Sequence, residues 1–199
     1  HGSMPSNGVD SLTAAAHILI ALQEIQAREL SIADRAVLTV GQFHGGTASN
    51  AIADSAVLGG TLRTFDEAVR ARIKTRLTEI SQGVAAAFRA KAQVVFGSGC
   101  PTLVNDAGLS QAVGGYLEEL LGPAPKLGAL QGQSGGSEDF AYVSHQVPSI
   151  MVALAAGEPD KGYPYPQHHP QVRFDESVLP VGSAVYAWPA IRWLEDHPL

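Results

Sequence analysis

The chain has 199 residues, of which 45% are hydrophobic and 16% are charged, a balance typical of one or two ordinary globular domains. Acidic residues number 19 and basic residues 13, so the net charge is −6, which disfavours a surface for nucleic acid or anionic membrane. The single cysteine, Cys100, cannot form an internal disulfide, and no apolar run approaches the roughly 20 residues of a membrane helix. We therefore expect a soluble, cytoplasmic protein with neither a membrane nor a nucleic-acid partner.

The first half of the chain predicts a small α/β domain. A helix with Asp10 as its N-cap precedes two apolar strands, 36–43 and 54–65, which are joined by the Gly-rich turn "HGGTASNAIA". A second helix opens at Phe65-Asp66, and "AQVVFGSG", residues 92–99, is expected to form a third strand. The order helix, strand, strand, helix, strand predicts a ferredoxin-like α/β sandwich over residues 1–99, with two helices on one face of an antiparallel sheet.

The second half, residues 100–199, has a different character. A capped amphipathic helix in "NDAGLSQAVGGYLEELLG" and a final helix around residues 175–195 flank two short apolar segments, "KLGALQG" and "SIMVALAAG". Such apolar strands are typical of sheets that are buried on both faces, and two strands are too few to build one. The pattern predicts the last part of a larger α/β domain whose first strands lie upstream of residue 1.

The stretch "YPYPQHHPQVRFDE", residues 163–176, sets two adjacent histidines between prolines, and such a rigid loop can hold an imidazole against a metal ion. The seven histidines show no His-x-x-x-His spacing, and one cysteine makes no thiolate cluster. Adjacent residues of an extended segment face opposite sides, so at most one of His168 and His169 can face a given ion. Without further evidence, a solvated loop is the alternative interpretation.

Several motifs resemble one family of enzymes. In order and spacing, "HGSMPSNGVDSLTAAA", "GQFHGGTASNAIADSAVLGGTLRTFD", "LVND", "SGGSEDFAY" and "YPQHHPQVRFDE" are similar to segments of amidohydrolases of the hippurate hydrolase, N-acyl-amino-acid hydrolase and auxin-conjugate hydrolase type, relatives of the aminoacylases and glutamate carboxypeptidases. The resemblance implies a ferredoxin-like lid domain that forms a homodimer, followed by the C-terminal portion of a doubly wound, zinc-peptidase-like α/β catalytic domain. The family's Cys-x-His segment, Glu-Glu pair and a further His precede the lid and are absent from this chain.

The resemblance also implies roles for individual residues. His168 matches the family's last metal ligand, and His169 falls at a variable position. His1 matches a catalytic lid histidine, and Asn50 and Arg63 match substrate-binding lid residues that reach into the partner subunit's active site. Arg can grip a substrate carboxylate bidentately, Asn adds a neutral donor, and His stabilises the oxyanion formed when water attacks an amide.

Each of these residues also has a plainer interpretation. "HGSM" is a common remnant of an affinity tag, although "GSMPSNGVD" continues the family pattern. Asn50 alone is typical of a turn, and Arg63 alone is typical of a solvated strand.

The loop "SGGSEDF" has two interpretations as well. By resemblance it lines the substrate pocket, with Gly136 at the substrate and Glu138 or Asp139 orienting a metal-bound group. The alternative is that these carboxylates only cap a helix.

The implied reaction is metal-dependent hydrolysis of the amide bond of N-acyl amino acids or small peptide-like conjugates, with zinc or manganese in a dinuclear site. This chain alone is expected to be inactive, because one imidazole cannot replace a full ligand set. The alternative function is that of a non-catalytic, dimerising small-ligand-binding module of ferredoxin-like fold. The sequence does not determine the acyl group, the amino acid or the metal.

Overall fold

The computed structural model describes residues 1–97, 99–122 and 135–198. In chain order its elements are η1 (Pro5–Asn7), α1 (Ser11–Glu24), η2 (Ile25–Glu29), β1 (Ala36–Gly45), β2 (Ala56–Thr64), α2 (Glu67–Ala87), α3 (Ala107–Leu121), α4 (Ala141–Ser144), η3 (Pro159–Lys161), η4 (Glu176–Val178) and α5 (Leu179–Asp196). The chain divides into two compact units, and the division falls between Thr102 and Leu103, near the expected domain boundary after residue 99. The described residues Gly135 to Ser137 group with the first unit.

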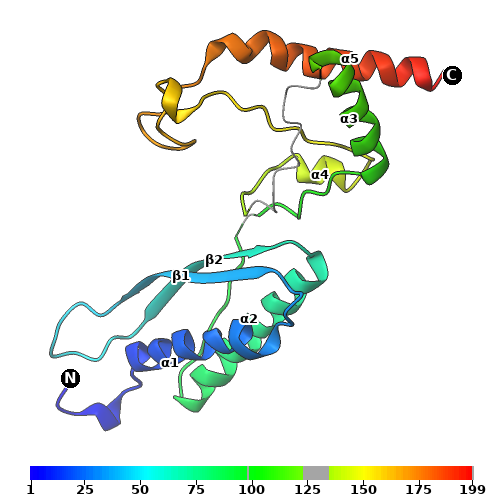
Figure 1. Cartoon of the computed structure of the whole chain (residues 1–199). Coiled ribbons are helices and arrows are strands. Elements are labelled where there is room, and N and C mark those ends of the chain that lie inside the picture. The colour runs from blue at the N-terminus through cyan, green and yellow to red at the C-terminus, as the bar shows by residue number, and fades with distance from the viewer. Residues whose placement is uncertain (98, 123–134, 199) are drawn as a thin grey trace. The chain divides into compact units, whose positions relative to one another are not determined.

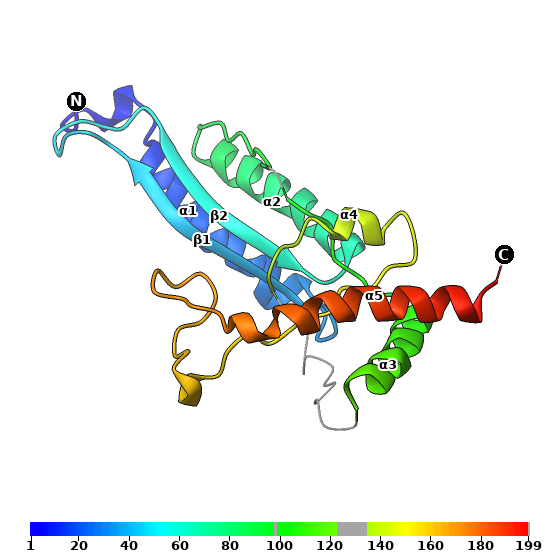
Figure 2. The same ribbon diagram turned by 90° about the horizontal axis from the view of Figure 1, so that it is seen from above.

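The first unit is an antiparallel two-stranded ribbon with two helices on one face. β1 and β2 pair from Ala36 opposite Thr64 to Gly45 opposite Ala56, with one irregularity between Val40 and Gln42. Figures 1 and 2 show α1 and α2 side by side along the same face of this ribbon. The expected α/β lid, with its two helices and its first two strands, is therefore confirmed.

The alternation of side chains along the strands decides which face is buried. The core between the helices and the ribbon holds Ile18, Leu22, Ile25, Val69, Ile73 and Ala85, with Leu38, Val40, Leu58 and Leu62 packed against them. The intervening residues Val37, Thr39, Thr61 and Arg63 are exposed on the opposite face, as a strand period of two requires. One face of the ribbon is thus covered, and the other is open within the described residues.

Both long helices of this unit begin at the aspartates that the sequence indicates. The Asp10 carboxylate accepts hydrogen bonds from the Leu12 and Thr13 amides at 3.0 and 3.1 Å, and Asp66 accepts one from the Val69 amide at 2.9 Å. These bonds satisfy backbone donors that have no partner within the first helical turn.

The expected third strand, residues 92–99, is wrong for the residues that the structure describes, since residues 92–97 pair with no strand. Side chains of α2 hold this part of the chain instead. The Lys74 ammonium lies 5.2 Å from the centroid of the Phe96 ring, and an Arg70 Nη donates to the Cys100 carbonyl at 2.9 Å. A ladder requires a neighbouring strand that exchanges backbone hydrogen bonds, and here α2 takes the place of that neighbour.

The second unit packs α3 against α5, confirming both expected helices. The Asp106 carboxylate caps α3 through the Leu109 amide at 2.8 Å. The Tyr116 hydroxyl donates to Asp196 at 2.6 Å, and this carboxylate raises the pKa of the Tyr116 hydroxyl above its ordinary value. These contacts hold the two helices together at the end of α5.

The expected strand "SIMVALAAG", residues 149–157, is also wrong, because no described residue pairs with it as a strand. The Asn105 side chain forms hydrogen bonds with both backbone groups of Met151. Its Oδ1 accepts from the Met151 amide at 2.9 Å, and its Nδ2 donates to the Met151 carbonyl at 3.1 Å. A side-chain amide thus replaces a strand neighbour, and Met151 and Leu154 are each 44% exposed. The other expected strand, 126–132, lies outside the described residues.

Among the described residues, none of the helices combines the length and the apolar character needed to cross a membrane.

Replacing Ile73 tests the core of the first unit. Ile73 is 1% exposed, so we expect Ile73→Ala to lower the free energy of unfolding by about 2–5 kcal/mol through lost burial and the cavity left behind. Ile32→Ala is the matched control, because Ile32 is fully exposed and its loss should change the free energy by less than about 0.5 kcal/mol. Urea unfolding followed by far-ultraviolet circular dichroism measures both changes, and equal effects would contradict this core.

Candidate functional site

The structure brings His1 and Asn50 together. The Gly2 amide donates to the Asn50 carbonyl at 2.8 Å, which ties the start of the chain to the loop between β1 and β2. A Cβ on Gly2 would lie 3.1 Å from that carbonyl oxygen, so a glycine suits this close approach. In Figures 1 and 2 the N-terminus lies beside this loop, which projects beyond the strands. We call His1, Gly2, Ser3 and Asn50 the tip corner.

Within the tip corner, Ser3 sets the orientation of the His1 ring. The Ser3 amide donates to His1 Nδ1 at 3.2 Å, and the Ser3 hydroxyl lies 2.7 Å from the same nitrogen. A backbone N–H can only donate, so Nδ1 is the acceptor and a neutral ring carries its proton on Nε2. This tautomer leaves an N–H donor on the side of the ring away from Ser3.

Arg63 lies at the other end of the ribbon. It pairs with Val37 on the exposed face of β2, seven residues from the Gly45–Ala56 end that leads into the tip loop. At about 3.3 Å per residue, these seven steps span about 23 Å. The structure therefore does not bring Arg63 together with His1 and Asn50 of the same chain. Within the described residues no hydrogen bond or ion pair occupies the Arg63 guanidinium.

His168 occupies a strained position in the second unit. Its φ of 71° lies in the left-handed region, which costs a non-glycine residue of order 1–3 kcal/mol. The side chain is exposed, and within the described part of the chain no hydrogen bond engages the ring. Such strain is typical of residues whose position is set by function, and this imidazole fits as one ligand of a divalent ion.

His169 has a different environment from its neighbour. Its ring stacks on Tyr165 with centroids 4.2 Å apart and an angle of 8° between the planes, and its Nδ1 accepts from the Gln171 amide at 3.1 Å. The His169 amide also donates to the Pro166 carbonyl at 3.1 Å. His169 therefore holds the turn that places His168.

Gly136 is exposed in the stretch that leads to α4. Beside it, Glu138 serves the helix start, since its carboxylate accepts from the Phe140 amide at 3.4 Å and its carbonyl accepts from the Ala141 amide at 3.2 Å. These contacts agree with the capping interpretation of Glu138, and a substrate contact at Gly136 stays a prediction.

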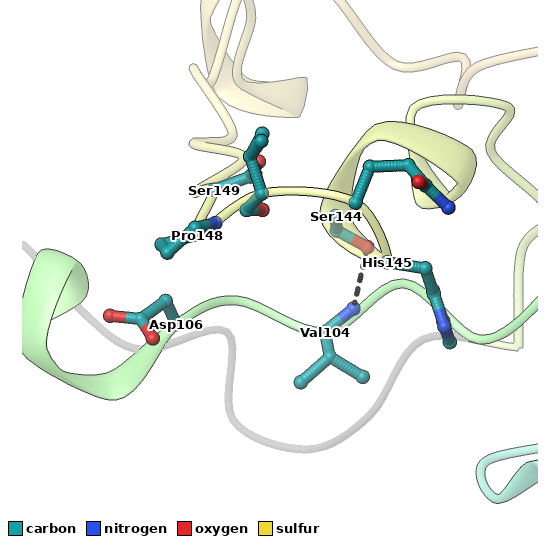
Figure 3. A pocket seen from close by; sticks show the side chains of 8 residues that line it. Val104, Asp106, Ser144, His145, Pro148 and Ser149 are labelled. Atoms are coloured by element: carbon teal, nitrogen blue, oxygen red, sulfur yellow. Dashed lines mark hydrogen bonds between the residues drawn. The ribbon is translucent and has the colours of Figure 1, made fainter.

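A shallow pocket of ≈ 300 Å³ in the second unit contains none of the predicted site residues. Figure 3 shows Asp106, Ser144 and His145 around it, the residue types of a hydrolytic triad. Backbone contacts occupy two of them, however. The Ser144 hydroxyl donates to the Ala141 carbonyl at 2.9 Å and accepts from the Val104 amide at 3.4 Å, while Asp106 caps α3. The pocket therefore does not support nucleophilic catalysis by Ser144.

Sequence reasoning missed Ser3 and Tyr165, which orient His1 and His169. A signal for both was present, because each lies within four residues of the histidine that it contacts. No group of three or more His, Cys, Asp or Glu side chains that could hold a metal ion occurs within the described ranges. His168 is therefore at most one member of a larger ligand set.

Comparison with known proteins adds the family. A family model described as "peptidase dimerisation domain" matches residues 1–88. An uncharacterized hydrolase, y4tI, of Sinorhizobium fredii is 37% identical over 90% of this chain and 44% of its own length. N-acetyl-L-cysteine deacetylase of Bacillus subtilis is 34% identical over 99% of the chain and 45% of its length, and IAA-amino acid hydrolase ILR1-like 2 of Arabidopsis thaliana is 32% identical over 98% and 44%. The chain spans about half the length of the curated relatives it matches.

A solved structure agrees with these matches. The YXEP protein of Bacillus subtilis, a dinuclear metal-binding peptidase from the M20 family, superposes with a TM-score of 0.75 at 28% identity, over 96% of this chain and 47% of that one. The first unit is thus an α/β dimerisation domain. Residues 1–88 match the M20 dimerisation domain, and the whole chain is similar to part of several M20 hydrolases, in agreement with the resemblance in its motifs.

The strain at His168 predicts an unusual response to glycine. His168→Gly should be more stable than His168→Ala by about 1 kcal/mol, because glycine adopts a positive φ at no steric cost. At the neighbouring Gln167, where φ is not positive, the order should reverse, with Ala more stable than Gly. Both tryptophans, Trp188 and Trp193, lie in α5 of the same unit, so urea unfolding followed by tryptophan fluorescence measures all four variants. The same order at both positions would contradict the left-handed conformation.

Proposed function

We propose that the full-length protein is a metal-dependent amidohydrolase that cleaves N-acyl amino acids or small peptide-like conjugates and releases a carboxylic acid and a free amino acid. The observation that carries this proposal is the match to an N-acetyl-L-cysteine deacetylase over 99% of the chain, which includes both units. The match to an IAA-amino acid hydrolase supports the same reaction class, because both names describe hydrolysis at the nitrogen of an amino acid.

In this proposal His168 is one ligand of a divalent metal site, and a dinuclear M20 peptidase among the structural relatives supports this role. When bound, divalent ions supply an activated water and polarise the acyl carbonyl. Zinc and manganese both suit an imidazole ligand. His168 contributes a neutral ring nitrogen, and the stacked His169 and Tyr165 keep the turn in place.

The tip corner supplies the donors for the reacting carbonyl. His1 presents its Nε2–H away from Ser3, and this group can donate to the oxyanion that develops as water attacks. Asn50 lies beside it and adds a neutral donor. The family match begins at residue 1, which supports His1 as a native residue. By resemblance to the family, this corner acts in the active site of the partner subunit.

Arg63 binds the free carboxylate of the amino-acid half. Its guanidinium is exposed and without a described partner, and the planar fork matches a carboxylate bidentately.

We also propose that the Gly136 loop lines the substrate pocket and that the first unit forms the homodimer. Among the described residues no third strand pairs with the ribbon and one of its faces is uncovered, and both features support this dimer. A reducing compartment such as the cytoplasm suits the single cysteine, Cys100.

The metal-ligand role is tested in the full-length protein by comparing adjacent histidines. Removing a residue that only supports a metal ligand typically lowers metal affinity about 10- to 100-fold. His168→Ala removes a ligand itself, so it should lower metal affinity by more than this, and turnover of N-acetyl amino acids should fall as well. His169→Ala should retain the metal, because its ring nitrogen accepts from the Gln171 amide. Metal content after gel filtration and calorimetric titration measure the difference, and equal metal loss in both variants would refute the assignment.

The carboxylate role of Arg63 is tested with two substrates. Arg63→Ala should lower kcat/KM for N-acetyl amino acids and leave metal content unchanged. The loss of kcat/KM should correspond to about 2–5 kcal/mol of transition-state stabilisation. With the matching amino-acid amides, which lack the carboxylate, the variant and the wild type should differ little. A comparable loss for both substrates would show that Arg63 does not recognise the carboxylate, while absence of any hydrolysis by the wild type would reject the proposed function itself.

A further inference from the structure

We infer that Arg89, just after the C-terminal end of α2, is a positioning residue for the tip corner. Its side chain fastens residues 1–8, which we call the N-terminal segment, and so fixes where His1 lies. This role rests on the proposed function, in which His1 donates to the reacting carbonyl. All of these residues belong to the first unit.

Arg89 has an unfavourable backbone conformation. α2 ends in a Schellman motif, in which the Arg89 amide donates to the Ala86 carbonyl at 3.0 Å. The Ala90 amide donates to the Ala85 carbonyl at 2.8 Å and completes the motif. The φ of Arg89 is 62°, in the left-handed region where glycine is the usual residue of this motif, because a Cβ is disfavoured there. The helix end alone would favour glycine, so the arginine side chain contributes something that a glycine cannot.

The Arg89 guanidinium binds the N-terminal segment. One of its Nη atoms donates to the Gly8 carbonyl at 3.1 Å, a contact between residues 81 positions apart in the sequence. The preceding residue, Phe88, contacts α1, because its ring lies 4.5 Å from the ring of His17. In Figures 1 and 2 the C-terminal end of α2 lies on the side of the domain where the N-terminus is. The end of α2 therefore holds residue 8 in place.

Backbone hydrogen bonds continue from Gly8 to His1. The Gly8 amide donates to the Pro5 carbonyl at 3.2 Å. The Asn7 amide then donates to the Met4 carbonyl at 3.1 Å, and the Met4 amide donates to the His1 carbonyl at 2.9 Å. The N-terminal segment is thus a run of linked turns, and a shift at Gly8 is passed on to His1.

The loop between β1 and β2 contacts the other side of the segment. It does so through the bond from the Gly2 amide to the Asn50 carbonyl, and a Cβ on Gly8 would lie 3.5 Å from the Ile52 side chain. Asn50 is exposed, whereas Ala85 in the last turn of α2 is 1% exposed. Because local stability follows buried packing, Arg89 links the segment to the firmer of its two supports.

A plainer role for Arg89 is that of a cation at a helix end. A basic side chain there complements the partial negative charge of the last carbonyls, whatever else it contacts. Lys91 is the matched control, since it is an exposed cation two positions further along and makes no hydrogen bond to Gly8 among the described residues. A purely electrostatic role predicts similar effects of removing either side chain.

Hydrogen exchange of the full-length protein tests the anchor directly. Arg89→Gly and Arg89→Ala should both speed amide exchange in the peptide of residues 1–8 by about 2- to 10-fold, the factor that one hydrogen bond contributes to local opening. Lys91→Ala should leave this exchange unchanged. Exchange mass spectrometry measures the rates, and unchanged exchange in both Arg89 variants would overturn the inference.

The two Arg89 variants also separate the side chain from the backbone strain. Arg89→Gly should unfold at a higher urea concentration than Arg89→Ala, because glycine tolerates a positive φ. Both lose the guanidinium, so both should loosen the segment in spite of this difference in stability. Faster exchange in Arg89→Ala alone would mean that the helix end, and not the contact with Gly8, controls the segment, and would contradict the inference.

Turnover of N-acetyl amino acids measures the consequence for His1. Arg89→Gly should lower kcat with little change in KM, because a displaced donor weakens the transition state more than substrate binding, and a shift of 1 Å costs up to about 100-fold. In a His1→Ala background the same change should lower kcat no further, since no His1 ring is left to position. An equal loss in both backgrounds would show that Arg89 acts on the overall structure, which would reject the positioning role.

The two measurements distinguish this role from the proposed function. Absence of any hydrolysis by the wild type would reject the proposed function, and hydrogen exchange would then decide by itself whether Arg89 anchors the segment. Faster exchange with an unchanged kcat would reject the positioning of His1 by Arg89 and leave the proposed function intact.

Discussion

The antiparallel ladder between β1 and β2 sets the distances on which the proposed site depends. Its hydrogen bonds fix the register from Ala36–Thr64 to Gly45–Ala56, so the two ends of the first unit cannot approach one another without breaking the ribbon. At one end the chain passes through Thr102 into the second unit, and at the other the Gly2 amide binds the Asn50 carbonyl. The ladder therefore keeps the Thr102 end of the first unit apart from the tip corner.

The two units differ in how well they satisfy their own apolar and polar groups. In the first unit, helices cover the apolar face of the ribbon, and Ile25 and Ile73 are each 1% exposed. In the second unit, α5 exposes Tyr186 at 86% and Leu194 at 67%, and the Trp188 Nε1–H is buried without a hydrogen-bond partner among the described residues. Buried polar groups are normally satisfied, so the Trp188 indole is an exception among the described residues.

Backbone strain and ring stacking distinguish the two adjacent histidines. His168 holds a left-handed φ that a glycine would adopt more easily, while His169 stacks on Tyr165 and accepts a backbone hydrogen bond. The second histidine thus contributes local packing that offsets the strain of the first. Two identical side chains, side by side in the sequence, therefore have different local environments.

The sequence by itself determined the helix starts at Asp10, Asp66 and Asp106, the β1–β2 pair and the family, because caps, strand periodicity and motif order are local properties. It also indicated His168 over His169, although only through resemblance. Tertiary structure decided the rest. The apolar segments 92–97 and 149–157 have strand composition, but α2 and the Asn105 side chain bind them where a strand neighbour is lacking. Likewise Asn50 and Arg63 are 13 positions apart in the sequence, and the extended ladder between them places these two residues at opposite ends of the ribbon. The physical reason is that a strand rises about 3.3 Å per residue, whereas a helix rises about 1.5 Å, so a strand gives the larger distance for the same sequence separation.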